Sequence, residues 1–107
     1  MVDIQQQSTF LEQCHSQGNI NGMMLNNRFI KAGTFENMTP KGKPTERLLN
    51  FHSAFAEGGI AMTTIGYCAV ENDGRLNNRM MYMGEHIRDE LQQFIQNLQG
   101  KGTKVSG

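Results

Sequence analysis

The sequence predicts an α/β fold in which parallel strands alternate with helices. Three observations support this prediction. The chain of 107 residues reads as strand, helix, strand, helix, and a third short strand-like segment follows at residues 104–106. Long loops rich in glycine, proline and asparagine lead from each strand to the next helix. Because a parallel sheet needs helical crossovers and covered faces, two such units form only part of a larger layered domain.

Residues 1–26 are polar and contain several glycines and asparagines, which favour turns. Their apolar side chains are isolated and follow no regular period. We therefore predict an irregular or hairpin segment over residues 1–26, followed by the α/β domain over residues 27–107.

The first β/α unit opens the predicted domain. Bulky apolar and long basic side chains mix over residues 28–32, which indicates a short strand. Residues 33–44 form a long loop that contains both prolines of the chain. Thr45 is suited to cap a helix, and apolar residues then recur at helical spacing as far as Gly58. This pattern predicts a helix near residues 45–57.

The second β/α unit begins with residues 60–67, which are uncharged and rich in β-forming side chains, as expected of a strand buried on both faces. Residues 68–84 form another long loop. A clear amphipathic stripe predicts a helix near residues 85–99, which ends at Gly100. Residues 104–106 begin a third parallel strand, and we expect the chain to be a fragment that stops within it.

The connections between these units predict how they curve. Right-handed crossovers place both helices on the same side of the sheet. This is the arrangement of a TIM (β/α)8 barrel, so we predict the N-terminal β/α units of an incomplete barrel. Both long loops leave the C-terminal ends of strands, where barrels and open α/β sheets bind ligands.

Composition argues against several classes of function. Ten basic and ten acidic side chains balance without a basic stripe, so nothing favours nucleic acid or an anionic membrane surface. No long apolar run or leader pattern is present, which predicts a cytoplasmic protein without membrane contact. Cys14 and Cys68 show no disulfide framework and no metal-ligand spacing with the histidines, so we predict reduced thiols and no metal site. The expected partner is a small molecule or a protein.

The glycine-rich nucleotide motifs are absent, because Gly33-Thr34-Phe35-Glu36 matches neither the dinucleotide fingerprint nor the P-loop. A Gly-Thr pair after the first strand remains. Small residues there let a planar ligand approach the backbone, and the threonine hydroxyl can donate and accept hydrogen bonds. The simpler interpretation is that both are turn residues.

Several short motifs occur in a specific order. They are Asn27-Arg28-Phe29-Ile30-Lys31-Ala32, Pro44-Thr45-Glu46-Arg47-Leu48, Ala56-Glu57-Gly58-Gly59-Ile60, Val70 with Gly74-Arg75, and Gly102-Thr103-Lys104-Val105. In this order they resemble the N-terminal part of the Old Yellow Enzyme-like NADH:flavin oxidoreductases. The resemblance covers residues 22–107.

The resemblance implies a TIM barrel that holds FMN at its C-terminal mouth. It implies that NADH or NADPH reduces the flavin and that an activated alkene or an enoyl thioester accepts the hydride. Ala32, Gly33 and Thr34 correspond to the family segment that lies against the flavin ring, and Tyr67 corresponds to a position whose backbone approaches it. The family's catalytic residues come later than residue 107, so no catalytic residue is assigned.

Other interpretations stay open at this stage. His52 fits a packing residue, Cys68 fits an inert buried thiol, and Glu36 or Glu57 could act as a general base, although neither shows a partner in the sequence. Unpaired strand edges are templates for association. The chain is therefore alternatively a non-catalytic module that pairs with a complementary fragment or with a copy of itself, or a marginally stable product without a function.

Overall fold

Residues 4–107, which the computed structural model describes, contain three α-helices, seven short strands and three 3-10 turns. The helices are α1 (Ile4–His15), α2 (Glu46–Glu57) and α3 (Arg88–Gln99). The strands are β1 (Gly18–Ile20), β2 (Met23–Leu25), β3 (Ile30–Lys31), β4 (Met62–Thr64), β5 (Cys68–Ala69), β6 (Met81–Tyr82) and β7 (Lys104–Ser106). The turns are η1 (Pro40–Gly42), η2 (Asn72–Gly74) and η3 (Glu85–Ile87).

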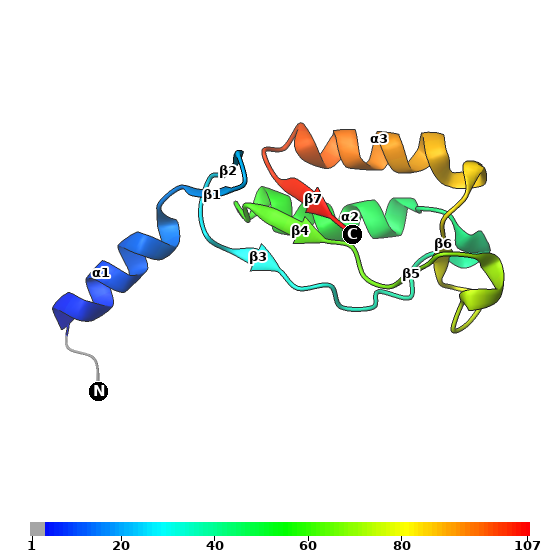
Figure 1. The fold of residues 1–107 in the computed structure, drawn as a ribbon, viewed down its shortest axis with the longest axis horizontal. Coiled ribbons are helices and arrows are strands. Elements are labelled where there is room, and N and C mark those ends of the chain that lie inside the picture. Colours follow the sequence, from blue (N-terminus) through cyan, green and yellow to red (C-terminus); the bar gives the residue numbers. More distant parts are fainter. Residues whose placement is uncertain (1–3) are drawn as a thin grey trace.

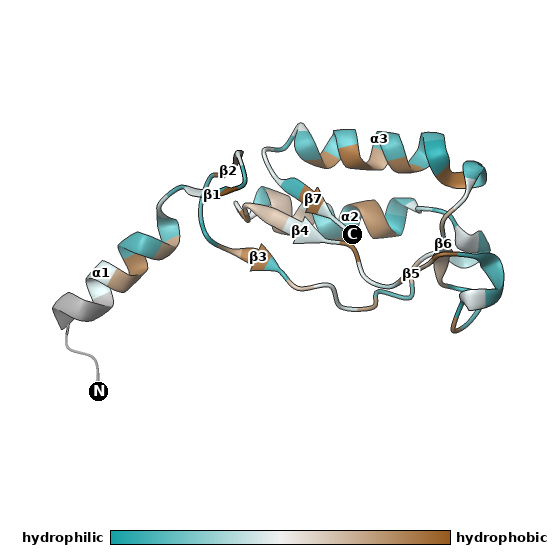
Figure 2. Cartoon of the chain, in the orientation of Figure 1, coloured by the Kyte–Doolittle hydropathy of each residue, from teal (hydrophilic) through white to brown (hydrophobic). Residues whose placement is uncertain are grey.

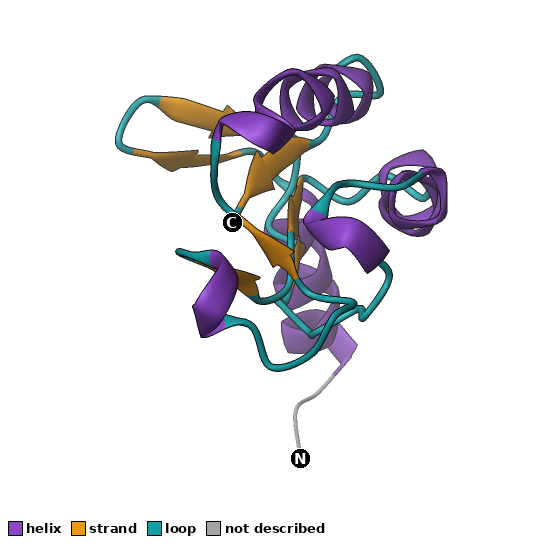
Figure 3. Cartoon of the chain, turned by 90° about the vertical axis from the view of Figure 1, so that its right-hand side faces the viewer, coloured by secondary structure: helices purple, strands orange, loops and turns teal. Residues whose placement is uncertain are grey.

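The centre of the molecule is a parallel sheet with the strand order β3, β4, β7. Its register aligns Ile30 with Met62 and Met62 with Lys104. Helix α2 connects β3 to β4, and helix α3 precedes β7 (Figure 1). Figure 3 looks toward the end where the strands finish and shows the two helices as neighbours on one side of the strands. The structure confirms the predicted α/β class, with an open sheet that corresponds to part of a TIM barrel.

The sheet strands are shorter than the apolar segments that predicted them. Residues 60–67 were expected to be one strand, yet only Met62–Thr64 form β4. Met62 and Thr63 pair on both sides, and Thr64 pairs with β7 alone. The Ile65 amide still donates to the Ser106 carbonyl at 2.8 Å. The chain then turns out of the sheet at Gly66. The loop after it contains the short parallel pair β5–β6, which the sequence pattern did not indicate.

The leading segment differs from its prediction because it contains helix α1 as well as a hairpin. Phe10 and Leu11 of α1 are exposed, and over residues 8–15, where burial is described, no side chain is buried. This part of the helix therefore has no buried stripe by which to recognise it. The hairpin β1–β2 turns through Asn21 and Gly22, both with positive φ, as a tight hairpin turn requires. Residues 1–3 lie outside the described residues, and the boundary at residue 27 stays a prediction.

Helix α2 begins as its sequence predicts. The Thr45 hydroxyl oxygen accepts a hydrogen bond from the Leu48 amide at 3.1 Å, which caps the first turn. The same hydroxyl donates to the Met38 carbonyl at 2.7 Å and so ties the preceding loop to the helix. The buried residues Leu48, His52 and Ala56 follow at intervals of four and face inward.

The main core lies between α2, α3 and the sheet. Figure 2 shows the apolar residues of α3 on the side toward the sheet and polar residues on its outer side. The buried members are Leu48, Ala56, Ile65, Met81, Ile87, Phe94 and Leu98. A second, smaller cluster consists of Leu25, Ala61 and Met62 with Met23, and it covers the N-terminal end of β4 with the hairpin.

The molecule is more extended than a compact domain of its size. Its radius of gyration is 16.4 Å, whereas about 13 Å is expected for a compact chain of this length. Helix α1 accounts for much of this difference, because it projects away from the sheet and helices (Figure 1). The Arg28 amide donates to the Cys14 carbonyl at 2.8 Å and holds the end of α1 to the body.

Candidate functional site

The residues that follow β3 and β4 meet at the C-terminal edge of the sheet. A Cβ atom added at Gly66 would collide with the Thr34 backbone and with the Glu36 carboxylate, so only glycine allows this approach. A Cβ atom at Gly33 would lie 3.1 Å from the Thr64 Cγ2 atom. The ring of Phe35 lies 5.7 Å from the ring of Tyr67, measured between centroids. The two segments chosen from the sequence are therefore neighbours.

The four predicted cofactor-binding residues are all exposed. Ala32, Gly33 and Thr34 are exposed, and Tyr67 is 61% exposed. The Thr34 amide donates to the Ala32 carbonyl at 3.0 Å, which makes a tight turn. Small side chains next to one aromatic ring suit contact with a flat ligand. The assignment of these residues to a cofactor stays a prediction.

Lys31 fixes the ends of both strands from the helix side of the sheet. Its ammonium group donates to the Ala32 carbonyl at 2.7 Å and to the Thr64 carbonyl at 3.3 Å. It also lies 5.5 Å from the ring centroid of Phe51 and 5.6 Å from that of Phe55, both on α2. A positive charge is thus held at the C-terminal ends of β3 and β4.

A buried polar network lies directly beneath the exposed surface. The Glu36 carboxylate accepts hydrogen bonds from the Gly66 amide at 2.9 and 3.1 Å and from His52 Nε2 at 2.8 Å. His52 Nδ1 lies 2.6 Å from the Thr63 hydroxyl oxygen. The side chains of His52 and Glu36 are 0% and 6% exposed. The network therefore links the loop after β3, helix α2 and strand β4.

Hydrogen bonding decides the ionisation of this carboxylate. Burial raises the pKa of Glu36, but the hydrogen bonds from His52 and from the Gly66 amide lower it by more, so the pKa is below its ordinary value. The carboxylate is ionised at neutral pH. Because Nε2 donates a hydrogen bond to this carboxylate, Nδ1 of a neutral His52 ring accepts a hydrogen bond from the Thr63 hydroxyl.

This network corrects one interpretation of the sequence and agrees with another. Glu36 has a partner, which sequence reasoning missed because His52 stands 16 positions later, on a helix. His52 does pack in the core, edge-on to Phe94 with 5.8 Å between ring centroids. One feature of the sequence could have indicated this network. His52 occupies a buried position in the helical pattern of α2, and a buried imidazole requires hydrogen-bond partners.

The second loop is tied to the first by polar contacts. The Thr39 amide and hydroxyl both donate to the Arg79 carbonyl, at 3.1 and 2.8 Å, and Arg79 Nε donates to the Asn37 carbonyl at 3.3 Å. The guanidinium of Arg75 lies 5.0 Å from the ring centroid of Tyr82. In this arrangement both arginines contact the protein itself.

Neither cysteine is well placed for thiol chemistry at the site. Burial raises the pKa of the Cys68 thiol, which disfavours the nucleophilic thiolate. Cys14 lies in the last turn of α1, which joins the body beside the β1–β2 hairpin and away from β5 and β6 (Figure 1). Within residues 4–107 no group of three or more metal-ligating acidic, histidine or cysteine residues occurs. No helix in this part of the chain has the length and apolar character needed to span a membrane.

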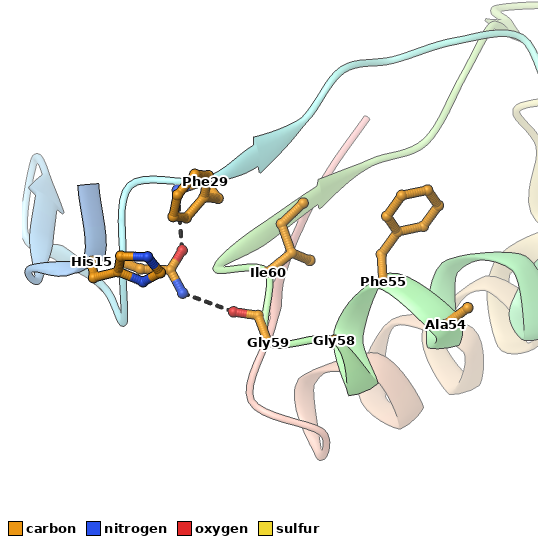
Figure 4. A pocket seen from close by; sticks show the side chains of 8 residues that line it. His15, Phe29, Ala54, Phe55, Gly58, Gly59 and Ile60 are labelled. Atoms are coloured by element: carbon orange, nitrogen blue, oxygen red, sulfur yellow. Dashed lines mark hydrogen bonds between the residues drawn. The ribbon is translucent and has the colours of Figure 1, made fainter. Parts of the chain in front are cut away.

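A separate groove of about 560 Å³ lies near the N-terminal end of the sheet (Figure 4). Its walls include His15, Phe29, Phe55 and Ile60. The Asn27 side chain crosses its floor, donating to the Gly59 carbonyl at 2.7 Å and accepting from the Phe29 amide at 3.0 Å. None of Ala32, Gly33, Thr34 and Tyr67 lines this groove. The groove is thus distinct from the predicted site.

Comparison with solved structures supports the fold. The chain is similar to Old Yellow Enzyme from Pichia sp. AKU4542, with a TM-score of 0.77 and 14% sequence identity. The match covers 87% of this chain and 25% of that enzyme. At this identity the likeness concerns the fold, and it places the chain with one part of a TIM-barrel protein.

Comparison with characterised sequences finds two reductases. The chain is 39% identical over 81 residues to 4,4'-dithiodibutanoate disulfide reductase from Rhodococcus erythropolis, a match that covers 76% of this chain. It is 24% identical over 90 residues to a metal reductase from Desulforamulus reducens, covering 84% of the chain. These matches span 20% and 14% of the two relatives. No protein-family model matches the chain.

Proposed function

We propose that this chain forms the opening β/α units of an FMN-dependent oxidoreductase that takes hydride from NADH or NADPH. The observation that carries the proposal is the meeting of residues 33–35 with residues 64–67 at the C-terminal edge of the sheet. Ligands bind at this edge in TIM barrels. The reductase names of both relatives support a redox function.

The residues at this edge suit one face of a flavin. Ala32, Gly33 and Thr34 present little bulk, and the Thr34 hydroxyl offers a donor and an acceptor. Tyr67 and Phe35 add aromatic surface beside them. A bound flavin would supply the hydride-transfer chemistry, while these residues would hold and orient it. The acceptor site and the catalytic residues are not assigned to this chain.

The acceptor that we propose is an activated alkene or an enoyl thioester. The names of the relatives add two further classes for comparison, a disulfide and a metal ion. Cys68 gives no support to a route through a protein thiol, because its thiolate is disfavoured. A disulfide acceptor would therefore have to receive hydride without a mixed disulfide at this residue.

FMN binding tests the proposal directly. Flavin fluorescence is titrated with the full chain, with Ala32→Glu, and with Gln92→Glu as the control. Both variants add one negative charge at an exposed position, but only Ala32 belongs to the predicted site. We expect Ala32→Glu to weaken FMN binding by at least about tenfold, which corresponds to about 1.4 kcal/mol, and the control to bind like the wild type. A wild-type chain that does not bind FMN, or equal affinities for all three, would contradict the proposal.

A second candidate function is association through the sheet edges. In the described residues β3 and β7 each pair on one side only, and Ile30 on β3 is 48% exposed. Open parallel edges are templates for another strand. The partner would be a complementary fragment or a second copy of this chain. Light scattering after size-exclusion chromatography tests self-association, and a stable monomer at micromolar concentration argues against a homo-oligomer.

A further inference from the structure

Three main-chain segments converge on one carboxylate. Glu36 lies in the loop after β3 and receives the Gly66 amide from the end of β4. It also receives His52 from α2, whose other nitrogen lies 2.6 Å from the Thr63 hydroxyl. Each hydrogen bond joins two different segments, so all are satisfied together only when loop, helix and strand are in place.

We propose that Glu36 is a positioning residue that fixes Ala32–Thr34 against Gly66 and Tyr67, so that the two segments present one preformed surface to the cofactor. This inference rests on the proposed function, because the surface is the one assigned there to the flavin. It adds a role for a residue that need not touch the flavin itself.

The chemistry of the network favours positioning over simple stabilisation. A buried ion pair is weak evidence for stability, since apolar side chains of similar volume often stabilise a core as well or better. An apolar residue at position 36 could fill the space but could not accept the Gly66 amide. Gly66 in turn must lack a side chain, because a Cβ atom there would collide with Glu36 and Thr34. The pair of residues is therefore matched in shape and in hydrogen bonding.

The surrounding charges are few. His52 is the titratable group hydrogen-bonded to Glu36, and it comes from α2. Lys31 Nζ caps the Ala32 and Thr64 carbonyls at the same end of the sheet. Strand β4 contributes the Thr63 hydroxyl, which does not titrate. A change at Gly66 on acidification that is missing from a Glu36 variant therefore reports on Glu36.

Nuclear magnetic resonance of the 15N-labelled chain tests the inference. Glu36→Gln keeps the shape of the side chain and one acceptor, and Glu36→Leu removes both acceptors. Phe94→Leu is the control, because it loosens the core beside His52 and keeps every hydrogen bond of the network. In Glu36→Gln we expect the Gly66 amide to exchange at least about tenfold faster with solvent. The Lys104 amide on β7, which donates to the Ala61 carbonyl at 2.8 Å, should keep its rate. On acidification the Gly66 resonance should shift in the wild type and stay constant in this variant.

The link to the cofactor is tested by adding FMN to the same samples. We expect FMN to shift the resonances of residues 32–34 and 67, and its affinity to fall about tenfold in Glu36→Gln but not in Phe94→Leu. Glu36→Asp should restore part of the affinity.

Two results would separate the possible failures. Wild-type protection of Gly66 and wild-type FMN affinity in Glu36→Gln, or losses no larger than those of Phe94→Leu, would overturn the inference. If FMN shifts no resonance of the wild-type chain, the proposed function is contradicted. The exchange and acidification measurements would then test the positioning role of Glu36 without FMN. If Glu36→Leu fails to fold, Glu36→Gln still carries the test.

Discussion

The two ends of the parallel sheet are built by different physical means. At the C-terminal end, Glu36, His52 and Thr63 are joined by short hydrogen bonds in a buried network. At the N-terminal end, Leu25 and Met62 belong to a small apolar cluster beneath the hairpin. Apolar contacts tolerate repacking, whereas buried polar groups are costly unless every partner is in place. The polar end is therefore the end whose geometry is specified, and it is the end with the candidate site.

The largest expected effect comes from breaking the polar end. His52→Leu fills the same space but leaves the Glu36 carboxylate buried without its imidazole partner. We expect a loss of about 3–5 kcal/mol in the free energy of unfolding, measured by urea denaturation. Thr63→Val is the control, because it removes one neutral hydroxyl and should cost about 1 kcal/mol. Equal costs for the two variants would mean that the hydrogen bond between His52 and Glu36 does not organise this end.

A substitution at the apolar end should cause a somewhat smaller loss of stability and should leave the candidate site intact. Leu25→Ala removes a buried side chain of the hairpin cluster, and we expect a cost of about 2–3 kcal/mol from lost burial and a residual cavity. FMN affinity should stay that of the wild type, because the cluster is at the other end of the strands. A marked loss of FMN affinity in this variant would show that the two ends are coupled.

Removing the N-terminal cap of α2, which lies at the polar end, should cost less stability than either of the two substitutions above. Thr45→Ala deletes the acceptor of the Leu48 amide and the donor to the Met38 carbonyl. We expect a cost of about 1–2 kcal/mol, measured by thermal or urea unfolding. Thr45→Ser keeps both hydrogen bonds and serves as the control, so a loss as large as that of the alanine variant would assign the effect to the methyl group instead.

The smallest expected effect is the dependence of stability on pH. The folded state lowers the pKa of Glu36 relative to the unfolded chain, so the ionised carboxylate stabilises the fold above the ordinary glutamate range. This contribution is lost as the pH falls through the lowered pKa of the folded state. We expect unfolding free energies of the wild type and Glu36→Gln to converge on acidification. Parallel curves for the two proteins would show that Glu36 contributes no pH-dependent stability.

The sequence predicts the regular elements of the central fold and misses the contacts between them. The helices near residues 45–57 and 85–99 were visible because long periodic patterns with caps are strong signals. The strands were visible as apolar segments, but their ends were set by pairing and by the turn at Gly66. Helix α1 was missed because Phe10 and Leu11 are exposed and mark no buried stripe. The β5–β6 pair was missed because each strand has only two residues.

For the four predicted site residues, too, the sequence predicts the position in the fold but not the contacts. The alternation of strands and helices places Ala32, Gly33, Thr34 and Tyr67 at the same edge of a parallel sheet, and the structure brings their segments together. Whether they contact a flavin stays a prediction. The sequence indicated Glu36 as a candidate general base, but its hydrogen-bond partner could not be derived there. His52 is brought to it only by the packing of α2 on β4.

The sequence by itself determined the order of the β/α units, the cap of α2 and the edge of the sheet where a ligand would bind. These features depend on local patterns of apolar, turn-forming and capping residues, which involve residues close together in the sequence. Only the tertiary structure decided that Glu36, His52, Thr63 and Gly66 form one buried network. A hydrogen bond needs its two atoms within about 3 Å in a defined direction, and for residues far apart in the chain that condition is met only when helix and strand pack together.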